Sequence, residues 1–154
     1  MSRGSRKRHT GNRMSRRYSV VFLSTSGKRA TKLASLLSFA GIRVHQAPTA
    51  AEMRMLLQIT SAAVVLVDLA NIKSCGEILR GLAADFPDVG AVVLCPPGAE
   101  GAKFYVDGAF EVVVEPARFL DLLAALESAR EFHQELADPA RMHSRIDAVM
   151  QAVQ

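Results

Sequence analysis

Five short apolar runs alternate along the chain with segments of helical periodicity. The runs cover residues 19–23, 42–47, 62–69, 89–95 and 111–114. Between them, apolar residues recur at intervals of three and four, which is typical of amphipathic helices. The first such set is Ala30, Leu33, Leu36, Leu37 and Ala40. Strands that alternate with helices through short loops form parallel sheets with right-handed crossovers. The pattern therefore predicts an α/β domain with five strands and five helices.

The run at residues 62–69 is the most apolar, and its six consecutive apolar residues, Ala62 to Val67, end on a single carboxylate, Asp68. An unbroken apolar run of this length is typical of a strand that helices cover on both faces. The run at residues 42–47 is the most polar and suits a sheet edge. These two observations favour a flavodoxin-like, doubly wound sheet in the order 2-1-3-4-5. In such a sheet Asp68 lies at the carboxyl edge, where ligands bind.

Helix starts are marked by two segments with the spacing of a capping box. These are Thr49 to Glu52 and Ser74 to Glu77, in which the hydroxyl and the carboxylate can each satisfy a free amide. A short fourth helix is predicted over residues 100–106, after the helix-breaking sequence Pro96-Pro97-Gly98.

The net charge of +4 is unevenly distributed. Residues 1–17 carry seven basic side chains and no acid, whereas the other 137 residues carry 12 basic and 15 acidic side chains, a net charge of −3. The basic segment has almost nothing apolar to bury, so we expect it to be disordered. It is either a solvated leader or an electrostatic arm for nucleic acid, and a translation start at Met14 would remove most of it. We expect a folded α/β domain over residues 18–135 and an amphipathic helix over residues 136–154.

No apolar run approaches the roughly 20 residues of a membrane helix, and the N-terminal segment lacks the apolar stretch of a secretory signal. Cys75 and Cys95 match neither a disulfide framework nor a zinc pattern. We therefore expect a cytoplasmic protein that does not contact a membrane.

The last predicted helix carries an apolar stripe that needs burial. It either packs on its own domain or forms a contact with a partner or a second copy of the chain. The stripe consists of Met142, Ile146, Val149, Met150 and Val153.

The predicted topology brings four strand ends together, with the side chains Ser24, Thr25, Asp68, Cys95 and Glu115. At these residues the chain resembles the receiver domain of bacterial response regulators. The resemblance rests on Val64 to Leu69, on Ala40-Gly41-Ile42 and on the run Gly108 to Pro116, and it covers about three-quarters of the chain.

The resemblance implies a phosphoryl group on Asp68, Mg²⁺ held by that aspartate with an acidic pair, a Thr or Ser on strand four, and a Lys on strand five. It also implies an aromatic switch residue on strand five. This chain departs from each of these features except the aspartate and the proline that follows strand five. The departures are Ser24 and Thr25 for the acidic pair, Cys95 for the hydroxyl, Val112 for the aromatic and Glu115, before Pro116, for the lysine.

These departures remove charge that the family's chemistry uses. Mg²⁺ prefers carboxylate oxygens, and phosphoryl transfer depends on positioning and charge neutralisation. We therefore expect no cofactor and no bound Mg²⁺, and we expect a raised pKa for one carboxyl if Asp68 and Glu115 approach each other. Residues Ser24 to Lys28 do not form a phosphate-binding loop, because the first glycine is missing and Arg29 stands where Ser or Thr is required.

The sequence thus predicts a degenerate receiver, or pseudo-receiver, in signal transduction. It would act without enzymatic activity through contact with a sensor kinase or a downstream regulator, and no DNA-binding domain is expected after it. Three alternatives stay open: a phosphoacceptor regulator phosphorylated on Asp68, a nucleic-acid-associated module that uses the basic segment, and a small-ligand binder that uses the crevice at the strand ends.

Overall fold

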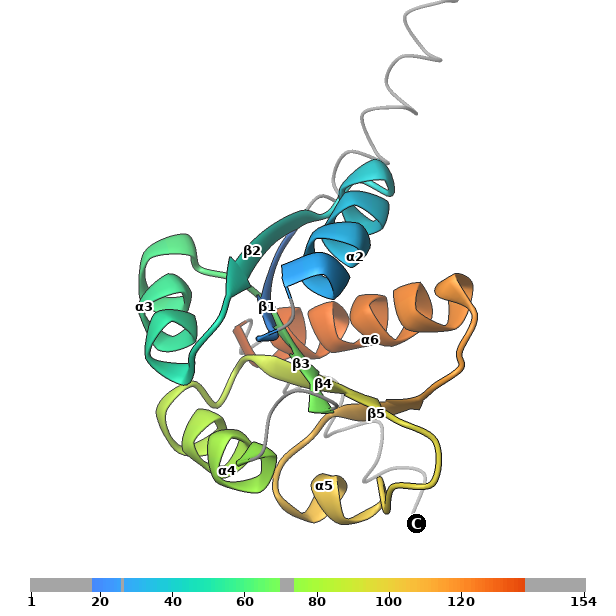
Figure 1. Cartoon of the computed structure of the whole chain (residues 1–154). Helices are drawn as coiled ribbons and strands as arrows, with labels where there is room; N and C mark the ends of the chain where they lie inside the picture. Colours follow the sequence, from blue (N-terminus) through green and yellow to red (C-terminus); the bar gives the residue numbers. More distant parts are fainter. Residues whose placement is uncertain (1–17, 26, 70–73, 138–154) are drawn as a thin grey trace, which may run out of the picture.

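A single parallel sheet forms the centre of the described structure. The computed structural model describes residues 18–25, 27–69 and 74–137. Within these residues the strand order is β2-β1-β3-β4-β5 (Figure 1), which confirms the predicted flavodoxin-like topology and the edge position of the second strand. The strands are β1 (Ser19–Leu23), β2 (Arg43–Ala47), β3 (Val64–Asp68), β4 (Gly90–Cys95) and β5 (Glu111–Val114).

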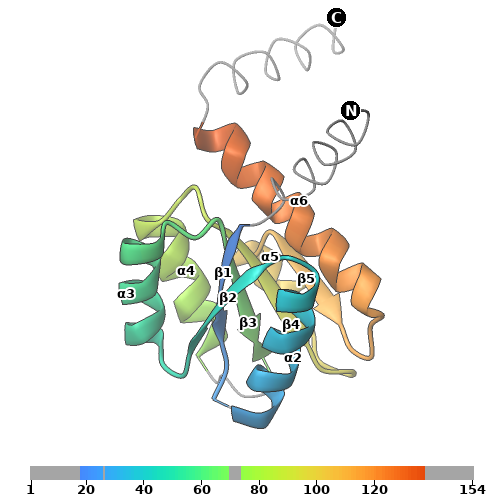
Figure 2. The same cartoon turned by 90° about the horizontal axis from the view of Figure 1, so that it is seen from above.

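The helices cover both faces of this sheet, as Figures 1 and 2 show. On one face, α2 (Gly27–Phe39) and α6 (Phe119–Ala137) pack through Leu37 and Leu126. The other face carries α3 (Ala50–Thr60), α4 (Cys75–Asp85) and α5 (Lys103–Val106). The sheet therefore separates two apolar clusters, as expected for a doubly wound fold.

The central strand β3 contributes side chains to both clusters. Val64 and Leu66 join the cluster beneath α2 and α6, while Val65 and Val67 join the opposite one. All four are fully buried. Burial of such a side chain is worth about 1.5–3 kcal/mol, so β3 is held firmly from both sides. This packing fixes the position of Asp68, the last residue of the strand.

Local details differ from the sequence expectation in two places. Thr49 accepts a hydrogen bond from the amide of Glu52 and caps α3, as predicted. The predicted cap at Ser74 is wrong, because within the described residues its side chain makes no capping hydrogen bond and its backbone lies at φ −100°, ψ 40°. The fourth predicted helix is also shorter than expected, because α5 begins only at Lys103 after the turns that follow Pro96.

Several predicted segments lie outside the described residues. These are the basic segment 1–17 and the apolar stripe of Met142, Ile146, Val149, Met150 and Val153. The preceding helix, α6, is described as far as Ala137, so the domain boundary predicted at residue 135 stays a prediction. None of the described helices is long and apolar enough to cross a bilayer.

Candidate functional site

Asp68 and Ser24 lie side by side at the carboxyl edge of the sheet. The register pairs Leu23 of β1 with Val67 of β3, so the next residue of each chain segment is also adjacent. Ser24 Oγ donates a hydrogen bond to Asp68 Oδ2 at 3.0 Å. Asp68 is fully buried and Ser24 is 6% exposed. A buried carboxylate is costly unless it is paired, so the surroundings of Asp68 must supply positive charge.

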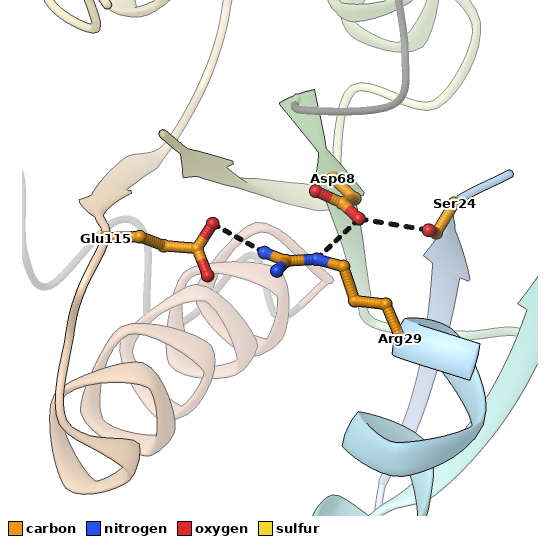
Figure 3. Close-up of polar contacts among 4 residues, drawn as sticks. All are labelled: Ser24, Arg29, Asp68 and Glu115. Carbon is orange, nitrogen blue, oxygen red and sulfur yellow. Dashed lines mark hydrogen bonds and ion pairs between the residues drawn. The ribbon is translucent and has the colours of Figure 1, made fainter. Parts of the chain in front are cut away.

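Arg29 supplies that charge. It is in the first turn of α2, and its Nε lies 2.7 Å from Asp68 Oδ2. The other end of the same guanidinium reaches Glu115, directly after β5, with Nη2 2.5 Å from Glu115 Oε1. Figure 3 shows the arginine extended between the two carboxylates, with Ser24 on the far side of Asp68. One cation therefore bridges the ends of β3 and β5.

The two carboxylates stabilise the charge of Arg29 at a position that otherwise disfavours a cation. The first turn of α2 contains Lys28 and Arg29 and no acid, although the positive end of the helix dipole disfavours cations there. The hydrogen bond to Glu115 is the main cause that raises the pKa of Arg29, and the charges of Asp68 and Glu115 add to it against an opposing effect of burial. The guanidinium therefore stays charged and acts as a fixed cation of the site.

The geometry does not suit Mg²⁺. This ion prefers several oxygen ligands, usually carboxylates and waters. Both carboxylates of the site, Asp68 and Glu115, are instead engaged by Arg29. Across residues 18–25, 27–69 and 74–137, no group of three His, Cys, Asp or Glu side chains could hold a metal ion. A metal would have to displace a guanidinium that contacts both acids, so these residues do not fit Mg²⁺.

Comparison with solved structures gives a consistent fold. A response regulator receiver domain from Clostridium thermocellum superimposes with a TM-score of 0.70 at 23% identity, covering 77% of this chain and 98% of that one. A CheY-like receiver domain protein from Methanospirillum hungatei JF-1 gives a TM-score of 0.68 at 16% identity, covering 77% and 98%. The chain has the receiver-domain fold. The structure of FixJ-N is also similar, with a TM-score of 0.68 at 20% identity, covering 74% of this chain and 94% of that one.

Sequence comparisons add nothing to this assignment. No protein-family model matches the chain, and no curated protein matches it. The receiver fold is therefore recognised through the arrangement of the backbone, because the solved structures named above are only 16–23% identical to this chain.

Other residues that the sequence singled out lie around this receiver-fold site without joining its ion pairs. Thr25 is exposed, although its neighbour Ser24 points to Asp68. Cys95 is fully buried at the end of β4, where burial raises the pKa of its thiol. Pro116 is exposed and follows a cis peptide bond from Glu115. The buried thiol therefore fills space at the position where the resemblance implies a Thr or Ser hydroxyl.

Val112, at the position of the family's aromatic switch residue, contacts a tyrosine from α5. Tyr105 Oη accepts a hydrogen bond from the Val112 amide at 3.0 Å and donates one to Glu111 Oε1 at 2.8 Å. The phenol therefore ties α5 to the exposed edge of β5. Sequence reasoning did not identify this aromatic contact, because Tyr105 precedes the strand rather than lying on it.

Arg29 is the principal residue that sequence reasoning missed. It entered that reasoning only as a mismatch to a phosphate-binding loop. The useful signal was the combination of a cation in the first turn of a helix with a glutamate at the lysine position after β5. The structure places Arg29 between Asp68 and Glu115, so a bridging cation replaces the direct approach of two carboxylates that the sequence analysis considered.

Proposed function

We propose that this protein is a degenerate receiver that acts in signal transduction by protein–protein contact, without the usual Mg²⁺-dependent phosphorylation of Asp68. The observation that carries this proposal is the engagement of both site carboxylates by the Arg29 guanidinium. The receiver fold supports a role in signalling, and the altered charges support the loss of Asp68 phosphorylation.

The argument concerns charge and access to the nucleophile. Phosphoryl transfer needs a positioned nucleophile and cations that neutralise the transferred group. Oδ2 of Asp68 contacts both Ser24 and Arg29, and Asp68 is fully buried. Glu115 adds a negative charge where an incoming phosphoryl group would need a positive one. Arg29 is therefore used to stabilise the carboxylates themselves, and the site resembles a permanently neutralised acceptor.

A surface for protein contact is available on α5, β5 and α6, which we call the α5–β5–α6 face and define by Tyr105, Val106, Val114 and Leu120. The exposed fractions of Val106, Val114 and Leu120 are 88%, 54% and 71%. Large exposed apolar side chains on adjacent elements are typical of interaction sites. This face supports a role in which shape and apolar contact carry the signal.

The phosphorylation claim is tested with acetyl phosphate and Mg²⁺ on the full chain, with intact-mass detection. A conventional receiver domain run in parallel shows that the reagent is active, and Asp68→Asn is the matched control. We expect no phosphoryl adduct on either form of this protein. An adduct that forms on the unmodified chain and is lost in Asp68→Asn would establish instead a phosphoacceptor regulator.

The contact claim is tested with single charge substitutions on exposed apolar residues. Val106→Glu on the α5–β5–α6 face should abolish cross-linked capture of the protein partner from native cells. Ile59→Glu on α3 is the matched control, because Ile59 is 72% exposed and α3 packs on β1 and β2, at the end of the sheet away from β5. Equal capture by both variants would argue against this face.

A further inference from the structure

A hollow lies between α2 and the start of α6, next to the Arg29 ion pairs. Its volume is about 260 Å³. We call it the α2–α6 hollow. Its apolar walls are formed by side chains from α2, β4, the loop before α6 and the first turn of α6, namely Leu33, Leu36, Leu94, Ala117, Phe119 and Leu122. Ligand sites in proteins are usually concave and mostly apolar, with a few polar groups that fix orientation.

Three cations and one acid complete the lining of the hollow. Lys32 and Arg118 line it from α2 and from the loop before α6, and Arg29 and Glu115 line it as an ion pair. Glu115 is neutralised by Arg29, at 2.5 Å. Arg118 has only an exposed pair with Asp121, at 3.6 Å, and Lys32 forms no ion pair with any residue that the structure describes. Exposed pairs such as Arg118–Asp121 are weak, so two cations are available to a ligand.

We propose that the α2–α6 hollow binds a small amphiphilic anion, in which one carboxylate is attached to a compact apolar body. The carboxylate would pair with Lys32 and Arg118 at the rim, and the apolar body would lie against Leu33, Phe119 and Leu122. A guanidinium and an ammonium together match a single carboxylate, and burial of the apolar body supplies the rest of the affinity.

The volume limits the size of the ligand. A hollow of about 260 Å³ suits a small ligand, such as a medium-chain or single-ring carboxylate. The proposal goes beyond the function proposed above and is independent of it, because the hollow and its cations exist whether or not Asp68 accepts a phosphoryl group.

The position of Arg29 gives the hollow a connection to the aspartate site. The same guanidinium lines the hollow and contacts Asp68. A ligand in the hollow would therefore lie beside the ion pairs at the ends of β3 and β5.

The test is a titration of the full chain with octanoate, whose size matches the volume, followed by amide NMR spectra. Octanol provides the apolar body without the charge, and acetate provides the charge without the body. We expect saturable shifts around Leu33, Phe119 and Leu122 with a Kd of about 0.1–1 mM for octanoate, and binding at least tenfold weaker for octanol and acetate.

Variants separate the proposed site from general apolar binding. Lys32→Glu combined with Arg118→Glu should weaken octanoate binding at least tenfold and leave the weak octanol binding unchanged. Lys28→Glu is the matched control, because Lys28 is exposed on the same helix but does not line the hollow. Leu36→Trp should narrow the hollow and weaken the binding of both octanoate and octanol. Octanoate shifts that do not saturate, that lie elsewhere, or that persist unchanged in the double variant would overturn the proposal.

Discussion

The ends of β3 and β5 place two carboxylates on one guanidinium in very different surroundings. Asp68 is fully buried and also accepts a hydrogen bond from Ser24, whereas the Glu115 side chain is 27% exposed. If Arg29 is replaced, water can stabilise the partly exposed carboxylate of Glu115 but not the buried carboxylate of Asp68. Arg29 is therefore a structural requirement at the end of β3 and only an aid at the end of β5.

The largest predicted effect comes from removal of the shared cation. Arg29→Met should lower the free energy of unfolding by about 2–4 kcal/mol, because it leaves a buried carboxylate without its charge partner. Urea denaturation measures this change. Lys28→Met, at the exposed neighbouring position, should alter stability by no more than about 0.5 kcal/mol.

A double-mutant cycle identifies which carboxylate causes the loss. Asp68→Asn added to Arg29→Met should recover about 1–2 kcal/mol, since the buried charge is then gone. Glu115→Gln added to Arg29→Met should recover much less. Equal recovery of stability from Asp68→Asn and Glu115→Gln would contradict the proposed difference between the ends of β3 and β5.

The Cys75 thiol is a second buried acidic group, and its cationic environment is weaker than that of Asp68. The pKa of Cys75, at the start of α4, is raised to about 11 from 9.0, mainly by burial, with the charge of Asp107 adding and that of Lys103 opposing. Above pH 9 the unfolded chain releases this proton while the folded chain retains it. Stability should therefore fall between pH 9 and about 11, by up to about 2 kcal/mol. Thermal unfolding of Cys75→Ala should show a flatter profile over that range.

The smallest predicted effect comes from Glu115, the more exposed of the two carboxylates that contact Arg29. Glu115→Gln should lower the free energy of unfolding by about 0.5–1 kcal/mol, because a partly exposed ion pair contributes little to stability. The cost should nearly vanish in 1 M NaCl, where charges are screened within about 3 Å. The cost of Arg29→Met should persist at the same salt concentration, and urea denaturation at two salt concentrations compares the two.

Much of the fold was predictable because it depends on local pattern. The apolar run of β3 and the polar character of β2 were sufficient for the strand order, since each reports how far a strand is buried. Capping was less predictable. Thr49 and Ser74 share one sequence spacing, but only Thr49 has the extended backbone, at φ −134° and ψ 158°, that brings its hydroxyl to the helix amide.

The site was predictable only in its backbone positions. Ser24, Asp68 and Glu115 follow from the ends of adjacent parallel strands. The role of Arg29 depends on how far a long side chain reaches from α2 across the sheet edge, and no periodicity in the sequence encodes that reach. The α2–α6 hollow was equally hidden, because its lining comes from segments that are more than 50 residues apart.

The most direct test of the account is a titration of the full chain with Mg²⁺ and beryllofluoride, followed by amide NMR spectra. Beryllofluoride imitates a phosphoryl group on an aspartate. With Arg29 held between the two carboxylates, we predict no saturable shifts at Ser24, Asp68 or Glu115. Saturable, Mg²⁺-dependent shifts at these residues that disappear in Asp68→Asn would contradict the central claim.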